Sequence, residues 1–274
     1  MGERGSEAER VSVAAAAVGT PAGAVLAGRI AVVTGASTGI GRAIALACSA
    51  AGADVALSYR SSEREARTVA EEIEARGRRA GVFQLDLADA AGLHAFAETV
   101  WRDFGRVDIW VNNAGADILT GRAAARSDVE KLDLLLSVDL RGTVLASWEA
   151  ARRMRQQPAG GVILNMSWDH VLVGMPGRNP EMFSAVKGGI LSFSKSLARS
   201  VAPNVRVNIL APGWIETEFG SELERERYLQ VARSTPLQRW GTPEDVARAA
   251  VFLASPNASF LTGQMLLVGG GVVM

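Results

Sequence analysis

The sequence contains few of the residues from which disulfides and metal sites are built. Its 274 residues include a single cysteine, Cys48, so a disulfide within the chain and a cysteine-rich metal site are both excluded. The two histidines, His94 and His170, are too few for a histidine cluster. We therefore expect no metal cofactor.

The chain also lacks an excess of either charge and lacks a long apolar run. Its 29 Lys and Arg residues balance 29 Asp and Glu residues, whereas a protein that binds nucleic acid through a broad electrostatic surface is basic. No run of about 18 uncharged apolar residues is present, so we expect no transmembrane helix. Nucleic acid and membrane are therefore not expected partners.

Residues 1–27 differ in composition from the rest of the chain. A polar start with both charge signs precedes the Ala- and Gly-rich run VSVAAAAVGTPAGAVLA. An export signal would need a basic start and a stronger apolar stretch, and Glu3, Glu7 and Glu9 argue against one. We expect a flexible tail over 1–27, one domain over 28–274, and a cytoplasmic protein.

From Arg29 onward, strand-like and helix-like segments alternate. The strand-like apolar runs are 30–34, 54–59, 80–85, 107–111, 161–166, 205–210 and 264–269. The segments with helical spacing are 42–51, 63–76, 90–104, 143–156, 183–201 and 243–254. Continuous apolar strands joined by helices are typical of a parallel sheet covered on both faces. The pattern predicts a single-domain, doubly wound α/β fold with seven parallel strands.

A glycine-rich turn lies between the first strand and the first helix. Gly35 permits a tight turn, while Gly39 and Gly41 let a phosphate approach the backbone and let helix and strand pack closely. The helix N-terminus offers N–H groups to a pyrophosphate. The turn predicts a Rossmann-type dinucleotide site with contacts from Gly35, Ser37, Thr38, Gly39, Ile40 and Gly41.

With its Gly-x-x-x-Gly-x-Gly spacing, the chain resembles the short-chain dehydrogenase/reductase family from about Leu26 to its C-terminus. The resemblance implies that Asp86 and Leu87, after the third strand, lie at the adenine ring. It also implies cofactor contacts from two further motifs, through Asn113, Ala114, Gly115, Pro212, Gly213, Ile215 and Thr217. One departure lies near the C-terminus, where Val268-Gly269-Gly270-Gly271 replaces the family's usual Val-Asp-Gly-Gly.

The end of the second strand indicates which nicotinamide cofactor is used. An acidic residue there would bind the ribose 2′-hydroxyl of NAD and repel a 2′-phosphate. The chain instead has Tyr59, Arg60, Ser61 and Ser62, so a guanidinium and two hydroxyls are available to a phosphate. We expect NADP(H) as the preferred cofactor, with NAD(H) as the alternative.

Three of the four catalytic positions implied by the resemblance are replaced. The family's lysine is present as Lys187, but its tyrosine position is Phe183, its serine position is Trp168 (with Ser167 adjacent), and its asparagine position is Asp139. A phenyl ring cannot transfer a proton, a function typically worth about 10²- to 10⁴-fold in rate.

The replacements have their own chemistry. Trp168 is large enough to fill substrate space or to stack on a flat substrate. Asp139 places a carboxylate near Lys187, and each group would keep the other charged in a dry site. Lys187 needs a partner when buried, which would be either Asp139 or the hydroxyls of the cofactor ribose.

Three functions are compatible with these replacements. The first is an oxidoreductase that moves a hydride to or from a carbonyl, an alcohol or a conjugated C=C of a small apolar substrate, with a different proton donor. Dienoyl-CoA reductases resemble the family and also lack the usual tyrosine. The second is a catalytically silent NADP-binding protein, and the third a non-redox enzyme that reuses the pocket. Candidate donors are Asp169, His170, Asp117 and Tyr228, and the Asp169–His170 pair is favoured because it directly follows the serine position.

The resemblance also implies a lid and an assembly. Residues 214–240 would cover the substrate, with Trp214, Phe219, Tyr228 and Leu229 lining an apolar pocket. The helices 143–156 and 183–201 correspond to the dimer faces of the family, so a homodimer or homotetramer is expected.

Overall fold

The computed structural model describes residues 24–217 and 224–274 and contains a seven-stranded, fully parallel sheet. The strands are β1 (Ile30–Val33), β2 (Asp54–Tyr59), β3 (Ala80–Gln84), β4 (Ile109–Asn112), β5 (Gly161–Met166), β6 (Val205–Pro212) and β7 (Met265–Val268). Their order is β3-β2-β1-β4-β5-β6-β7. The predicted doubly wound sheet is confirmed, with strand ends within about two residues of the expected positions.

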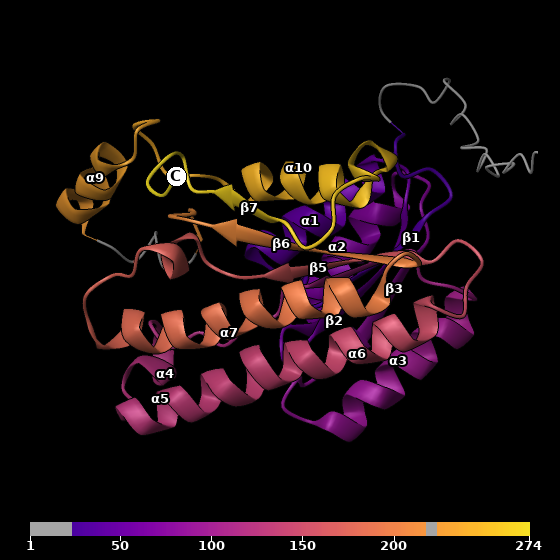
Figure 1. Cartoon of the computed structure of the whole chain (residues 1–274), viewed down its shortest axis with the longest axis horizontal. Coiled ribbons are helices and arrows are strands. Elements are labelled where there is room, and N and C mark those ends of the chain that lie inside the picture. The colour runs from indigo at the N-terminus through magenta and orange to yellow at the C-terminus, as the bar shows by residue number, and fades with distance from the viewer. Residues whose placement is uncertain (1–23, 218–223) are drawn as a thin grey trace, which may run out of the picture.

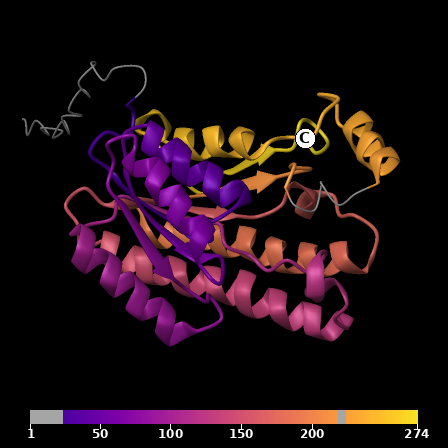
Figure 2. The same ribbon diagram turned by 180° about the vertical axis from the view of Figure 1, so that it is seen from behind.

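Helices cover both faces of the sheet (Figures 1 and 2). One face carries α1 (Gly39–Ala50), α2 (Glu63–Glu74) and α10 (Pro243–Ala254). The other carries α3 (Ala90–Phe104), α6 (Gly142–Met154) and α7 (Arg178–Val201). Alternate residues of each strand point to opposite faces, so the strands read as unbroken apolar runs, and each face builds its own hydrophobic core.

The structure adds elements that the sequence pattern did not predict. These are α4 (Gly121–Ala124), α5 (Asp128–Leu135), the π-helix η1 (Leu136–Arg141), and the 3-10 helices η2 (Asp169–Leu172) and η3 (Pro256–Ala258). The charged run in the expected lid forms α9 (Arg225–Ser234). A π-helical turn changes the spacing of apolar residues, so the continuous helical path from α5 through η1 into α6 has no simple 3.6-residue pattern.

The packed part of the chain begins earlier than expected. Leu26 was assigned to the tail, but its side chain is only 1 % exposed and belongs to a hydrophobic core. Its N–H donates to the Ala51 carbonyl at 2.8 Å. The packed part of the chain therefore begins before residue 28, and the short run of Ala, Val, Leu and Gly around Leu26 gave no local signal of burial.

The order of the strands concentrates loops at one edge of the sheet. Because every strand is parallel, the carboxyl ends of all seven meet at the same edge, where η2 and α9 also lie (Figure 1). The connections reverse direction between β1 and β4, and ligands of such sheets bind at this switch point.

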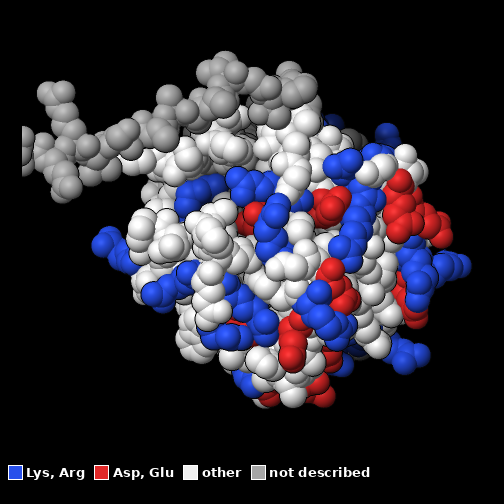
Figure 3. Space-filling view, turned by 90° about the vertical axis from the view of Figure 1, so that its right-hand side faces the viewer, with Lys and Arg blue, Asp and Glu red and all other residues white. Residues whose placement is uncertain are grey.

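No helix within 24–217 or 224–274 is long and apolar enough to cross a bilayer. On the face shown in Figure 3, basic side chains are more numerous than acidic ones, and the acidic side chains lie among them.

Candidate active site

The glycine turn is tied firmly to the end of β4. The Thr34 hydroxyl accepts the N–H groups of Asn113 and Ala114, both at 3.0 Å, and Asn113 Nδ2 donates to the carbonyls of Thr34 and Gly35. Gly35 has φ +63°, and a Cβ there would lie 2.9 Å from Ala114. A Cβ on Gly41 would lie 2.2 Å from the Gly35 carbonyl oxygen, so neither glycine can carry a side chain.

The N-terminus of α1 has no capping side chain. The N-cap residue Thr38 makes no side-chain cap hydrogen bond, and the first turn contains no acidic residue. Helix α10, in contrast, begins with a complete Thr242–Asp245 capping box. Among residues 24–217 and 224–274, the first neighbour that a Cβ built on Gly39 would meet is Thr217 Cγ2, at 3.9 Å, so these residues leave the positive end of α1 accessible beside Gly39. Ser37 and Ile40 lie in this same turn and are only partly buried.

The residues expected at the adenosine end lie on the neighbouring strands. Tyr59 is buried at the end of β2, while Arg60 and Ser61 are exposed beyond it. Asp86 is exposed, and its Oδ1 accepts the N–H of Ala88 at 2.9 Å. Leu87 is buried, and its side chain would lie 2.9 Å from a Cβ on Gly142.

The structure pairs Lys187 with Asp139. Lys187 Nζ lies 2.8 Å from Asp139 Oδ2, and the two side chains are 8 % and 1 % exposed. The other carboxylate oxygen, Oδ1, accepts the N–H of Ala116 at 2.7 Å. The π-helical turn η1 presents Asp139 to this position, and π-turns are frequent at functional sites. Gly115 lies against the same carboxylate, because a Cβ there would be 2.8 Å from Oδ2.

Two aromatic rings lie at the positions predicted to replace the family's tyrosine and serine. Phe183 precedes Lys187 by four residues on α7, so the two share a helix face, and the ammonium lies 5.4 Å from the ring centroid. The Trp168 ring meets Phe183 edge-to-face with centroids 5.7 Å apart. Ser167 Oγ donates to the Lys187 carbonyl at 2.9 Å, so its hydroxyl is engaged by the backbone of α7.

Asp169 and His170 form a buried pair on η2. His170 Nδ1 lies 2.6 Å from Asp169 Oδ1, and the two residues are 8 % and 0 % exposed. Burial raises the pKa of the Asp169 carboxyl, and the hydrogen bond and charge of His170 oppose that rise. The imidazole stacks on Trp168 at 4.8 Å and meets Trp214 edge-to-face at 6.1 Å.

The other two candidate proton donors are engaged elsewhere. Asp117 Oδ1 accepts the N–H groups of Leu119 and Thr120, and its Oδ2 accepts the Thr120 hydroxyl. Tyr228 donates its hydroxyl to Glu216 Oε1 at 2.7 Å, which raises the pKa of the phenol. His94 lies on the surface, where its side chain is 60 % exposed.

The lid segment is anchored by a residue that the sequence did not single out. Trp240 is buried, stacks on Tyr228 with centroids 5.1 Å apart and meets Trp214 edge-to-face at 5.6 Å. Its Nε1 donates to the Tyr228 carbonyl at 3.0 Å. Leu229 on α9 is half-buried, and Phe219 lies outside the described residues.

The segment that follows β6 lies between the glycine turn and the rings of Trp214 and Trp240. Pro212 pairs with Val268 in the sheet, and the N–H of Gly213 donates to the Val268 carbonyl at 3.1 Å. Ile215 is buried and forms an isolated bridge with Gly241, and Thr217 reaches toward Gly39.

The chain is similar to known oxidoreductases over most of its length. The family described as "Enoyl-(Acyl carrier protein) reductase" matches residues 35–273. The chain is 37 % identical over 245 residues to the 3-oxoacyl-[acyl-carrier-protein] reductase FabG of Staphylococcus aureus, covering 89 % of this chain and 98 % of that protein. It is 38 % identical over 253 residues to the L-rhamnose 1-dehydrogenase (NAD(P)(+)) of a Sphingomonas species, covering 90 % and 97 %.

Solved structures are also similar over nearly the full chain. A short-chain dehydrogenase from Burkholderia cenocepacia in complex with NADP superposes with a TM-score of 0.82 at 32 % identity, covering 90 % of this chain and 98 % of that one. A blue fluorescent protein from a metagenomic library, in complex with NADPH, superposes with a TM-score of 0.81 at 32 % identity, covering 91 % and 99 %.

Proposed function

Because the chain belongs to the short-chain dehydrogenase/reductase family, we propose that it is an NADP(H)-dependent oxidoreductase in which His170 replaces the usual tyrosine as the proton donor and acceptor. The observation that carries this proposal is the buried Asp169–His170 pair, which directly follows Trp168 in the chain. The His170 imidazole stacks on the Trp168 ring, which in turn meets Phe183 edge-to-face.

The residues present fit a dinucleotide. The dinucleotide can approach the protein backbone closely at Gly35, Gly39 and Gly41. The uncapped N-terminus of α1 suits its pyrophosphate. Arg60 and Ser61 are exposed at the end of β2, where the absence of a carboxylate favours a 2′-phosphate. Two of the similar solved structures contain NADP or NADPH. When bound, this cofactor supplies or removes the hydride.

The protein's part in the chemistry is to move the proton. Asp169 holds Nδ1 of His170, so Nε2 is the ring nitrogen left for exchange with a substrate. In carbonyl reduction, protonated His170 gives its Nε2 proton to the substrate oxygen, which becomes the hydroxyl. The ring is left neutral with its proton on Nδ1, held by Asp169. In the oxidative direction, Nε2 takes the proton from the alcohol.

Lys187 has a different role from that implied by the resemblance. Its ammonium is paired with Asp139 and faces a phenyl ring, so no phenol is present whose pKa it could lower. Through Asp139 Oδ1 and the Ala116 N–H, the pair instead fixes the loop after β4 relative to α7. We assign Lys187 and Asp139 to positioning of the cofactor side of the site.

The substrate is proposed to be small, planar and apolar. Trp168, Phe183 and Trp214 bring three aromatic rings to the region around His170. Such rings stack on conjugated groups, and none of the three carries a hydroxyl. An aryl ketone or a conjugated enone fits these three aromatic rings better than a sugar does.

Turnover with purified protein tests the proposal. NADPH binding is followed by nucleotide fluorescence, and its oxidation by absorbance against a panel of ketones, aldehydes and enones. His170→Ala and Asp169→Asn should each lower kcat by about 10²- to 10⁴-fold without weakening NADPH binding. His94→Ala, at the exposed histidine, is the matched control and should leave kcat unchanged. Saturable NADPH binding with no oxidation of any substrate would instead support a catalytically silent cofactor-binding protein.

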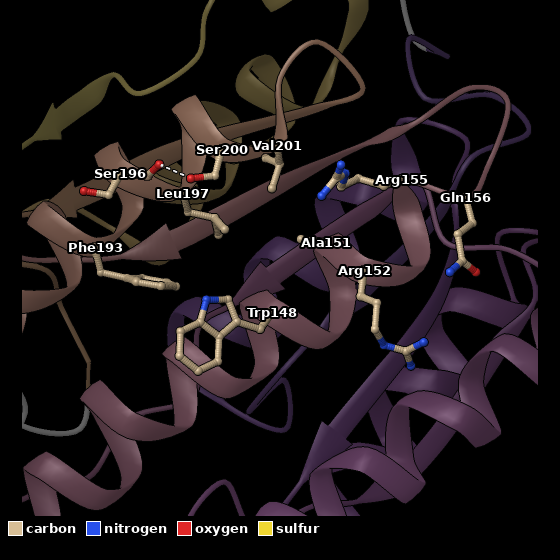
Figure 4. Close-up of a pocket in the computed structure, with 10 residues that line it drawn as sticks. All are labelled: Trp148, Ala151, Arg152, Arg155, Gln156, Phe193, Ser196, Leu197, Ser200 and Val201. Carbon is tan, nitrogen blue, oxygen red and sulfur yellow. Dashed lines mark hydrogen bonds between the residues drawn. The ribbon is translucent and has the colours of Figure 1, made fainter.

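We also propose that the protein is a homo-oligomer that associates through α6 and α7. Between these helices lies a groove of about 750 Å³, with Trp148 and Phe193 at one end and arginines at the other (Figure 4). Trp148 is 55 % exposed and meets Phe193 edge-to-face. A large exposed ring beside apolar helix surface is typical of an interface.

A further inference from the structure

The carboxylate of Asp169 lies in a notch between the ends of β6 and β7. A Cβ built on Gly213 would lie 2.4 Å from Asp169 Oδ2, and a Cβ built on Gly269 would lie 2.2 Å from it. Asp169 is fully buried, and Oδ2 has no hydrogen-bond partner among the described residues. The two glycines therefore provide the space that this oxygen occupies.

Backbone conformation does not explain these two glycines. Gly270 and Gly271 have φ values of +62° and +90°, which favour glycine, but neither Gly213 nor Gly269 has a positive φ. The φ values at both positions would suit alanine, although a Cβ on Gly213 would also lie 2.8 Å from the Gly269 Cα. At residue 269 the Asp169 carboxylate is the feature that requires glycine, whereas at residue 213 the carboxylate and the Gly269 Cα both require it.

The surrounding backbone is held in place on both sides of the notch. The N–H of Gly213 donates to the Val268 carbonyl, and Pro212 pairs with Val268 in the sheet. A methyl group at residue 269 would therefore displace the Asp169 carboxylate rather than the strands. Because Oδ1 of the same carboxylate lies 2.6 Å from His170 Nδ1, turning the group breaks that contact.

We infer that Gly213 and Gly269 are positioning residues, which hold the Asp169 carboxylate against His170 and thereby keep the neutral imidazole protonated at Nδ1. The inference explains the departure at the C-terminus, because any side chain at residue 269, an aspartate included, collides with the carboxylate at residue 169. Its consequence for catalysis rests on the proposed function, since it decides which nitrogen of His170 exchanges a proton.

The test measures the tautomer of the His170 imidazole directly by NMR. In protein labelled with ¹⁵N in its histidines, the chain gives only two imidazoles, His170 and the exposed reference His94. In the neutral form, His170 should be protonated predominantly at Nδ1. Gly269→Ala should move it toward the tautomer mixture of a histidine without such a partner, and should lower kcat about tenfold or more. The His94 signals should not change.

A double-mutant comparison isolates the proposed clash. In the Asp169→Ala background there is no carboxylate to displace, so adding Gly269→Ala should change neither the His170 tautomer nor kcat any further. Gly188→Ala is the matched control, because a Cβ there meets none of the atoms that the structure describes within 4 Å. Gly213→Ala is a second variant if Gly269→Ala folds poorly. Because its Cβ would also lie 2.8 Å from the Gly269 Cα, only the part of its effect that disappears in the Asp169→Ala background is assigned to the carboxylate.

The outcomes separate this inference from the proposed function. If Gly269→Ala leaves the His170 tautomer unchanged, or acts equally with and without the Asp169 carboxylate, the positioning role is wrong. If the tautomer shifts as expected but His170→Ala retains full turnover, the positioning role of the two glycines is supported and His170 is not the proton donor.

Discussion

Removing the Asp139 carboxylate should destabilise the fold strongly, because it leaves the Lys187 ammonium buried without its partner. The two charged atoms are 2.8 Å apart, and both side chains are more than nine-tenths buried. At an effective dielectric constant of about 20, their attraction is at most about 6 kcal/mol. Asp139→Ala also leaves the buried Ala116 N–H without its acceptor.

The net effect is smaller than the attraction, since part of it offsets the desolvation of both charges. Breaking one partner of a buried ion pair typically costs about 3–5 kcal/mol. For a domain of this size, each kcal/mol lowers Tm by about 2–4 °C, so Asp139→Ala should lower Tm by about 6–20 °C. Circular dichroism at one fixed protein concentration measures this shift.

Two comparisons make the reasoning refutable. Glu63 pairs with Arg67 on the surface, where both side chains are at least half exposed, so Glu63→Ala should lower Tm by less than about 2 °C. Replacing both buried charges, as Asp139→Leu with Lys187→Met, should recover most of the lost stability. A shift for Asp139→Ala no larger than that for Glu63→Ala, or a double variant no more stable than the single one, would show that the pair is not held dry.

Four further outcomes are expected. Phe183→Tyr should raise ketone reduction about tenfold or more by returning a phenol beside the site, and unchanged kcat/KM would argue against that alignment. Arg60→Asp should weaken NADPH binding at least about tenfold and spare NADH, as measured by fluorescence titration. Trp148→Glu should reduce the mass seen by light scattering, and an unchanged mass would place the interface elsewhere. The hydrogen bond from Arg239 lowers the pKa of the Asp245 carboxyl, so its stabilising effect is present at neutral pH and is lost as pH falls below about 4. Asp245→Asn should therefore lower Tm at pH 7, and the difference from the parent protein should shrink in acid.

Much of the architecture was predictable because its causes are local. A strand buried on both faces is an unbroken apolar run, and an amphipathic helix repeats every 3.6 residues, so the order of elements follows from short windows of sequence. The glycine turn, the missing carboxylate after Tyr59 and the phenyl ring at Phe183 are also local features. Together they predicted a dinucleotide fold with an altered site for proton transfer.

The roles of adjacent residues required the structure. The sequence favoured Asp169 and His170 but could not show that both are buried and in contact. It left the direction of Ser167 open, and the hydroxyl is engaged by the backbone of α7. After β5, neighbouring residues point toward different elements of the fold. Which element each side chain faces is determined by how the loop packs, and the sequence does not show this.

The sequence by itself determined the order of strands and helices along the chain, the glycine turn and the phenyl ring at residue 183, because each depends on residues that are neighbours in the chain. Tertiary structure alone decided that Asp139 is the partner of Lys187 and that Gly213 and Gly269 enclose the Asp169 carboxylate. These groups come from distant segments and meet only because the parallel sheet brings the ends of its strands to one edge, and the resulting distances are set by packing rather than by any sequence pattern.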